Sequence, residues 1–165
     1  MTVPVLAIVG YSNSGKTTLM EKLISKLSAH GLNVCSIKHS HHQLEMDTPG
    51  KDSWRHKQAG ASGSLLVGPE QMLMVKNVAQ AQTPQQLADT HFPDADLVLV
   101  EGYASMPCPK IEVVRQARSS DLRCDINELI AVVADMPDLD VEVPKLDLNH
   151  TDEVARFVLE WLKHD

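Results

Sequence analysis

The sequence has 165 residues, of which 43% are hydrophobic and 22% charged, and its formal net charge is −7. This length is typical of one domain with its own core, so we expect a single domain over residues 1–165. The negative charge argues against broad binding to nucleic acid or to an anionic membrane surface. No apolar stretch approaches the length of a membrane span, and the three scattered cysteines predict no disulfide framework, so we expect a cytoplasmic protein.

An apolar run over residues 5–9 predicts a buried strand that leads into residues 10–17. These read Gly-Tyr-Ser-Asn-Ser-Gly-Lys-Thr and fit the phosphate-loop pattern G-x-x-x-x-G-K-[ST]. In such a loop, backbone N–H groups and the following helix bind phosphates, Lys16 reaches the β- and γ-phosphates, and the Thr17 hydroxyl helps to hold Mg²⁺. The pattern predicts a nucleoside triphosphate site made of Gly10, Ser12, Asn13, Ser14, Gly15, Lys16 and Thr17.

Helical and strand patterns alternate along the rest of the chain. In order, we predict a helix over 17–30, a strand over 32–38, a polar stretch over 39–50, a helix over 51–61, strands over 64–67 and 71–78, a helix over 83–91, strands over 97–101, 111–115 and 129–134, and a helix over 151–163. The capping box that begins at Thr83 marks the start of the third helix. This order predicts an α/β fold of the P-loop NTPase type, with a mainly parallel central sheet flanked by helices.

Two carboxylates follow predicted strands, where open parallel sheets bind their ligands. Glu101 ends the most apolar strand, in the place from which an acid holds the water shell of Mg²⁺; a strand-terminal acid facing solvent is the alternative. Asp135 follows the strand over 129–134, where a carboxylate can accept hydrogen bonds from the N1–H and amino groups of guanine. A simple loop acid ahead of Pro137 explains Asp135 equally well.

A histidine-rich segment raises the question of a metal site. Histidines and cysteines are common metal ligands, but no second pair at a recognised spacing completes a site here. The candidates are His39, His41 and His42, with Cys35 and Cys108 as possible extra ligands. A solvated or phosphate-facing loop is therefore the better interpretation of the histidines, and packed apolar volume in a strand that of Cys35.

Longer motifs narrow the function. They are residues 10–18, Ile37-Lys38-His39, a string from Asp47 to Ala61 that contains Gly50-Lys51-Asp52-Ser53-x-Arg55, Glu101-Gly102-Tyr103, and Lys110-Ile111-Glu112-Val113-x-Arg115. Together they resemble the molybdopterin-guanine dinucleotide biosynthesis protein B (MobB) family over essentially the whole chain. The phosphate loop is shared by many families, whereas the string over 47–61 and the Glu-Gly-Tyr motif are far more specific.

The resemblance implies a GTP-binding, weakly hydrolysing homodimer with GTP and Mg²⁺ as cofactors, and it adds Thr18 to the nucleotide-binding residues. It also implies a role in attaching GMP to molybdopterin, as an adapter of a MobA-type nucleotidyltransferase that performs the transfer. Contacts with molybdopterin and with molybdoenzymes belong to the same expectation.

Three residues of the 47–61 string are candidates for the site. If Asp47 lies opposite the phosphates, it can bind Mg²⁺ or position water for hydrolysis. Lys51 and Arg55, four residues apart on one helical face, can bind the phosphate of the nucleotide or of the pterin; a solvated helix face is the alternative.

No water-orienting glutamine or arginine finger is evident beside the phosphate loop, so we expect slow turnover, which slightly favours an adapter over a cycle driven by hydrolysis. The alternative function is that of a metallochaperone GTPase of the nickel-insertion type, which uses a Cys-Pro-His-like element. Here Cys108-Pro109 is followed by Lys110, so the histidine of that element is missing.

Overall fold

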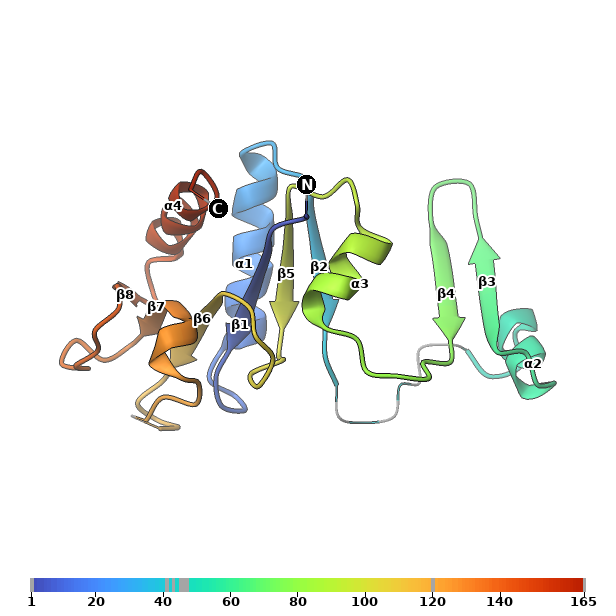
Figure 1. Cartoon of the computed structure of the whole chain (residues 1–165), viewed down its shortest axis with the longest axis horizontal. Helices are drawn as coiled ribbons and strands as arrows, with labels where there is room; N and C mark the ends of the chain where they lie inside the picture. Colours follow the sequence, from blue (N-terminus) through green and yellow to red (C-terminus); the bar gives the residue numbers. More distant parts are fainter. Residues whose placement is uncertain (1, 41, 43, 45–47, 120, 165) are drawn as a thin grey trace. The chain divides into compact units, whose positions relative to one another are not determined.

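The computed structural model describes residues 2–40, 42, 44, 48–119 and 121–164 of the chain. It divides into two compact units, which we describe separately: unit 1 comprises Met1–His39 and Gln82–Asp165, and unit 2 comprises Ser40–Ala81. Figure 1 shows the elements of both. The single domain over 1–165 stays a prediction.

Unit 1 is built on a parallel sheet, which has six strands within the described residues, in the order β2-β5-β1-β6-β7-β8. Its strands are β1 (Val5–Val9), β2 (Val34–Lys38), β5 (Leu97–Glu101), β6 (Lys110–Val114), β7 (Leu129–Ala134) and β8 (Lys145–Asp147). Because the strands are parallel, their carboxyl ends meet at one edge of the sheet. The predicted parallel α/β architecture is confirmed, and β8 is a strand that the sequence patterns did not reveal.

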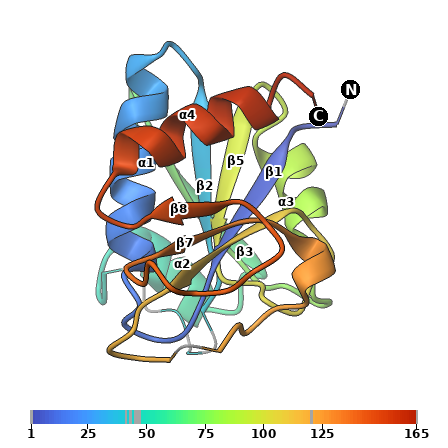
Figure 2. The same cartoon turned by 90° about the vertical axis from the view of Figure 1, so that its left-hand side faces the viewer.

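Helices cover both faces of this sheet (Figure 2). One face carries α1 (Lys16–Ala29) and α4 (Thr151–Trp161), and the other carries α3 (Pro84–His91). Alternate residues of β1 enter the two layers, with Leu6 and Ile8 on the α1 side and Ala7 and Val9 on the α3 side. All four are fully or almost fully buried, which is why β1 is continuously apolar and not alternating.

The ends of the helices follow from local chemistry. The predicted capping box at α3 is present: the Thr83 hydroxyl accepts from the backbone N–H of Gln86, whose side chain accepts from the backbone N–H of Thr83. A short 3₁₀ helix, η1 (Ile126–Glu128), precedes β7. It is capped by Asp125, whose carboxylate accepts from the backbone N–H of Asn127.

Unit 2 contains α2 (Asp52–Gln58) and a hairpin of two antiparallel strands, β3 (Gly63–Val67) and β4 (Met72–Lys76). Lys57 ties the helix to the base of the hairpin, because its ammonium donates to the carbonyl oxygens of Ala61 and Ser62 and to the side-chain oxygen of Asn77. In the part of the chain that is described, no helix has the length and apolar character needed to cross a membrane.

Candidate phosphate-binding site

The loop over residues 10–17 connects β1 to α1 at the carboxyl edge of the sheet. Gly10 has a φ of 139°, and a Cβ atom there would lie 2.4 Å from the Val113 carbonyl oxygen of the neighbouring strand β6, so no other residue fits. Gly15, with a φ of 101°, is the N-cap of α1. The two glycines therefore let the loop curl tightly over the end of β6 and enter the helix.

Lys16 folds back over the loop, where its ammonium donates to the Tyr11 carbonyl oxygen at 2.6 Å. Burial is the main cause that lowers the Lys16 pKa; the charges of Lys38 and Arg123 lower it further, and the carboxylate of Glu101 opposes them. The side chains of Ser12, Asn13, Thr17 and Thr18 are exposed around it. The loop thus presents a cation and several polar groups to an incoming anion.

Glu101 ends β5, which pairs with β1 so that Ile8 lies beside Glu101. Only 6% of Glu101 is exposed, and its Oε1 accepts from the Thr17 hydroxyl at 3.0 Å and forms an ion pair with Lys38 of β2. A hydroxyl and a carboxylate side by side are hard oxygen ligands of the kind that Mg²⁺ prefers, so these two residues fit that ion. A cleft opens beside them, and its other lining includes Met20, Ile24 and Ile37.

The opposite side of the loop holds two arginines that the analysis of strand ends did not single out. A Cβ atom at Gly15 would lie 3.2 Å from Nη2 of Arg115, which directly follows β6. Arg123 donates from Nη1 to the Gly10 carbonyl oxygen at 3.2 Å. Glu112, fully buried in β6, fixes the intervening segment because its carboxylate accepts from the backbone N–H groups of Arg123 and Cys124, at 2.6 and 3.0 Å.

Asp135 follows β7 at the same edge of the sheet. Its side chain is exposed, and its Oδ1 accepts from the backbone N–H of Gln116 at 2.8 Å. This bond ties the residue after β7 to the segment after β6. The other carboxylate oxygen faces no hydrogen-bond donor among the described residues.

The remaining predicted residues are Asp47, Lys51, Arg55 and the group of histidines and cysteines. Asp47 and His41 lie outside the described residues, and Lys51 and Arg55 belong to unit 2, where Arg55 lies 3.9 Å from the Asp52 carboxylate. The His39 ring lies 4.3 Å from the ring of Tyr103. The described residues contain no cluster of three or more His, Cys, Asp or Glu side chains able to hold a metal ion. Burial is the main cause that raises the pKa of both Cys35 and Cys108.

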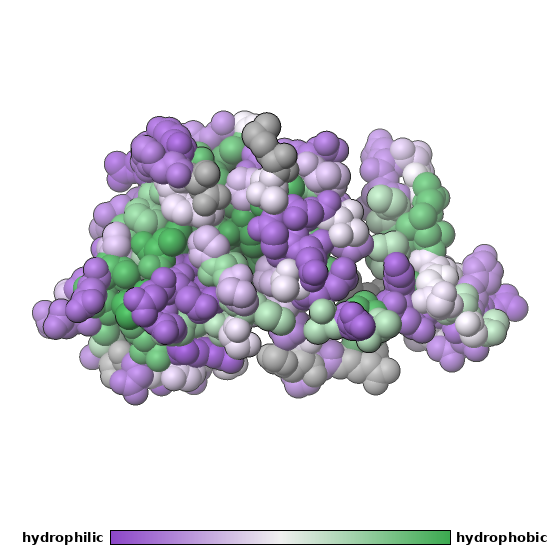
Figure 3. All heavy atoms as spheres, viewed as in Figure 1, coloured by the Kyte–Doolittle hydropathy of each residue, from purple (hydrophilic) through white to green (hydrophobic). Residues whose placement is uncertain are grey.

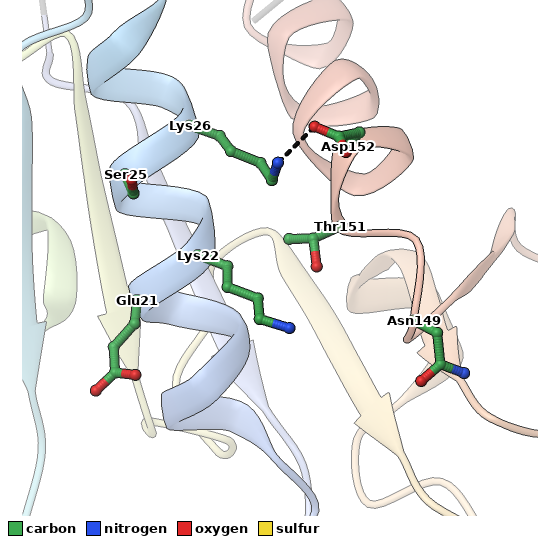
Figure 4. Close-up of a pocket in the computed structure, with 7 residues that line it drawn as sticks. All are labelled: Glu21, Lys22, Ser25, Lys26, Asn149, Thr151 and Asp152. Carbon is green, nitrogen blue, oxygen red and sulfur yellow. Dashed lines mark hydrogen bonds and ion pairs between the residues drawn. The ribbon is translucent and has the colours of Figure 1, made fainter.

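A second groove lies between α1 and the start of α4 (Figure 4). Two lysines, Lys22 and Lys26, and two acids, Glu21 and Asp152, line it, and Lys26 forms an ion pair with Asp152. The groove therefore has no excess charge to attract a phosphate, and the ion pair joins two helices that pack on the same face of the sheet.

Comparison with known proteins identifies the family to which the chain is similar. The family model described as "MobB: Molybdopterin guanine dinucleotide synthesis protein B" matches residues 5–135. The chain is 42% identical to the "Molybdopterin-guanine dinucleotide biosynthesis adapter protein" of Haemophilus influenzae, over 98% of this chain and 91% of that protein. Its identity to the protein of the same name from Escherichia coli is 35%, over 98% and 94% of the two chains.

Solved structures agree with this result. A MobB protein homolog from Bacillus stearothermophilus superposes with a TM-score of 0.72 at 26% identity, and the match covers 98% of this chain and 99% of that one. The match therefore includes the phosphate loop and its surrounding sheet. This protein belongs to the MobB family and has its P-loop fold, a mainly parallel sheet flanked by helices.

Proposed function

We propose that the protein binds GTP at the loop over residues 10–17 and acts in the cytoplasm as an adapter in the attachment of GMP to molybdopterin. Its partner would be a MobA-type nucleotidyltransferase, and molybdopterin and molybdoenzymes are the further molecules it would meet. The observation that carries the nucleotide part is the joining of this loop to Glu101 through the Thr17 hydroxyl. Membership of a family whose relatives are named adapter proteins supports the rest.

Each residue of the site has a distinct task in this proposal. The loop N–H groups from Gly10 to Thr18 hold the phosphates, and Lys16 exchanges its bond to the Tyr11 carbonyl for one to phosphate oxygen. Thr17 and Glu101 would hold Mg²⁺, with Asp47 as a further candidate ligand; the bound ion neutralises phosphate charge. Lys38, now paired with Glu101, keeps that buried carboxylate neutralised when the ion is absent.

Asp135 would read the base. One oxygen is held by the Gln116 N–H, which fixes the carboxylate, and its remaining lone pairs can accept from the N1–H and amino groups of guanine. Adenine has no such pair of donors, so this contact would select GTP. In unit 2, Lys51 and Arg55 are exposed and can bind the phosphate of the nucleotide or of the pterin.

The hairpin of unit 2 supports the proposed homodimer. Leu65, Val67, Met72 and Met74 share one face of its two strands, and between 49% and 73% of each is exposed. We call this set the apolar hairpin face; Figure 3 shows hydrophobic side chains along this hairpin. An isolated two-stranded hairpin is marginally stable in water, so a second copy that covers the face would stabilise it.

The adapter role is favoured over a cycle driven by hydrolysis, because relatives of this chain are named adapter proteins. Membership of the MobB family does not favour the alternative function, that of a metallochaperone GTPase of the nickel-insertion type. Single-turnover hydrolysis of GTP, measured with and without MobA, distinguishes the adapter role from the cycle driven by hydrolysis. We expect slow hydrolysis that MobA does not accelerate; strong acceleration would favour the driven cycle.

Binding itself is tested by titrating a fluorescent GTP analogue into the wild-type protein, Lys16→Ala and Lys22→Ala. Lys22 lies six residues further along α1 and is exposed, so its removal changes the net charge equally without touching the loop. We expect Lys16→Ala to weaken binding by about 10- to 100-fold and Lys22→Ala to leave it within about twofold. Competition by unlabelled ATP as strong as by GTP would contradict guanine selection by Asp135.

A further inference from the structure

Arg115 brings a guanidinium group against the phosphate loop from the β6 side. A Cβ atom at Gly15 would lie 3.2 Å from its Nη2 and 3.8 Å from its Cζ. Gly15 is the N-cap of α1, and β6 is the neighbour of β1, the strand that enters the loop. The arginine therefore lies at the amino end of α1, next to the residue whose N–H faces the phosphates in loops of this kind.

This is an unfavourable place for a cation in the absence of an anion. The amino end of a helix carries a partial positive charge, and Lys16 and Arg123 add two full charges close by. In residues 2–40, 42, 44, 48–119 and 121–164, Arg115 forms no ion pair, and its buried Nε has no hydrogen-bond partner. Within these residues, no acidic side chain compensates the charge of Arg115.

Arg123 also contacts this loop, but its contacts are those of a residue with a structural role. It donates to the Gly10 carbonyl oxygen, and the segment that carries it is fixed by Glu112. Arg115 makes no comparable bond to the loop within the described contacts. Its guanidinium therefore remains available for a ligand, and it presents donors in a planar fork that matches phosphate oxygens.

We propose that Arg115 binds the phosphate chain of the nucleotide, beside Lys16 and from the opposite side of the loop to Glu101. This inference rests on the proposed nucleotide binding, and it adds Arg115 of the same chain to the residues that bind the phosphates. Because loops of this type hold the α- and β-phosphates at the residues near Gly15, the contact is to the diphosphate that GDP and GTP share. Arg115 thus contributes to affinity for both nucleotides and is not a sensor of the γ-phosphate.

The test compares the affinities of fluorescent GDP and GTP analogues for the wild-type protein, Arg115→Gln and Arg118→Gln. Arg118 is three residues further along and exposed, so its variant loses the same charge away from Gly15. We expect Arg115→Gln to weaken both nucleotides by about 10- to 100-fold and Arg118→Gln to change either by no more than about twofold. Arg115→Lys, which keeps the charge but not the fork, should lie between wild type and Arg115→Gln.

Thermal unfolding without nucleotide separates ligand binding from a structural role. Removing an uncompensated cation from the amino end of α1 should leave the ligand-free Tm unchanged or raise it, whereas loss of a structural brace would lower it. Unchanged affinity in Arg115→Gln, weakening of GTP alone, or a lowered Tm with unchanged affinity would each overturn the inference. If the wild-type protein bound neither nucleotide, the proposed function itself would fail.

Discussion

At the scale of single residues, Lys16 shows how the loop prepares for an anion. Burial is the main cause of its lowered pKa, with contributions from Lys38 and Arg123, so its ammonium form is disfavoured in the ligand-free protein. A bound phosphate favours the charged form and must raise that pKa. Nucleotide binding is therefore coupled to proton uptake once the pH exceeds the lowered pKa of the free protein.

The first prediction follows from that coupling. The Kd for GDP should be constant below the lowered pKa of Lys16 and should rise with pH above it, by at most about tenfold per pH unit for one proton. The measurement is a set of titrations from pH 7 into the alkaline range. Lys16→Arg is the matched control, because its guanidinium stays charged throughout and any titration of the base is common to both proteins. Parallel curves for the two proteins would contradict the coupling.

How far the site could be predicted differs from residue to residue. The loop residues follow from one motif, because a glycine-rich turn between a buried strand and a helix leaves little conformational choice. The contact of Glu101 with Thr17 is consistent with the rule that ligands lie at strand ends. Arg123 was not predicted as a site residue, because its position depends on the buried Glu112 carboxylate. That contact joins a strand to an irregular segment, and no local sequence pattern encodes it. Arg115 ends a predicted strand, so the same rule applied to β6 would have found it.

At the scale of elements, β6 carries two fully buried charged residues, Lys110 and Glu112. Alternating polar residues in a strand are typical of a solvated face, yet residues 121–128, which include η1, contact the polar side chains of this one. Lys110 donates to the Glu128 carboxylate at 2.6 Å and to the Met106 carbonyl oxygen at 2.7 Å. The polar side chains of β6 therefore hold together the segments on either side of the strand.

We predict that Lys110→Met lowers the free energy of unfolding by about 2–4 kcal/mol, because Met106 loses a buried donor and Glu128 loses its partner. Glu128 is partly exposed and can be hydrated, which keeps the loss below that of a fully buried pair. The control is Lys163→Met, since the pair of Lys163 with Glu160 is largely exposed and screened by solvent, so its loss should have little effect. Urea unfolding of both variants measures the difference, and equal losses would contradict the assignment.

The elements themselves were mostly predictable, because buried runs and helical stripes are local signals. The predicted strand over 129–134 coincides with β7, and the predicted helix over 83–91 with α3 to within one residue. β8 was missed because it has only three residues, with a single buried one, Leu146, between two exposed neighbours. Its identity as a strand comes from pairing with β7, which is a tertiary contact.

At the scale of the whole molecule, the exposure of the apolar hairpin face is not explained by the contacts within one chain. Its residues form two cross-strand pairs, Leu65 with Met74 and Val67 with Met72, so the same side of both strands is apolar. Large exposed side chains gathered in this way mark interaction sites more often than isolated ones do. The apolar character of both strands was readable from the sequence, but the exposure of these side chains was not, because it depends on what packs against the hairpin.

We predict that the protein is a dimer in solution and that the paired substitutions Val67→Asp and Met72→Asp convert it to a monomer. Two carboxylates in place of a cross-strand apolar pair would be buried without partners in the interface, which costs several kcal/mol and opposes association. The matched control is Val78→Asp, an equally exposed valine beyond the end of β4. Light scattering coupled to size-exclusion chromatography measures the mass of each protein. A monomeric wild type, or a double variant that remains dimeric, would remove the hairpin from the interface, whereas a monomeric double variant that still binds GDP would place nucleotide binding within a single chain.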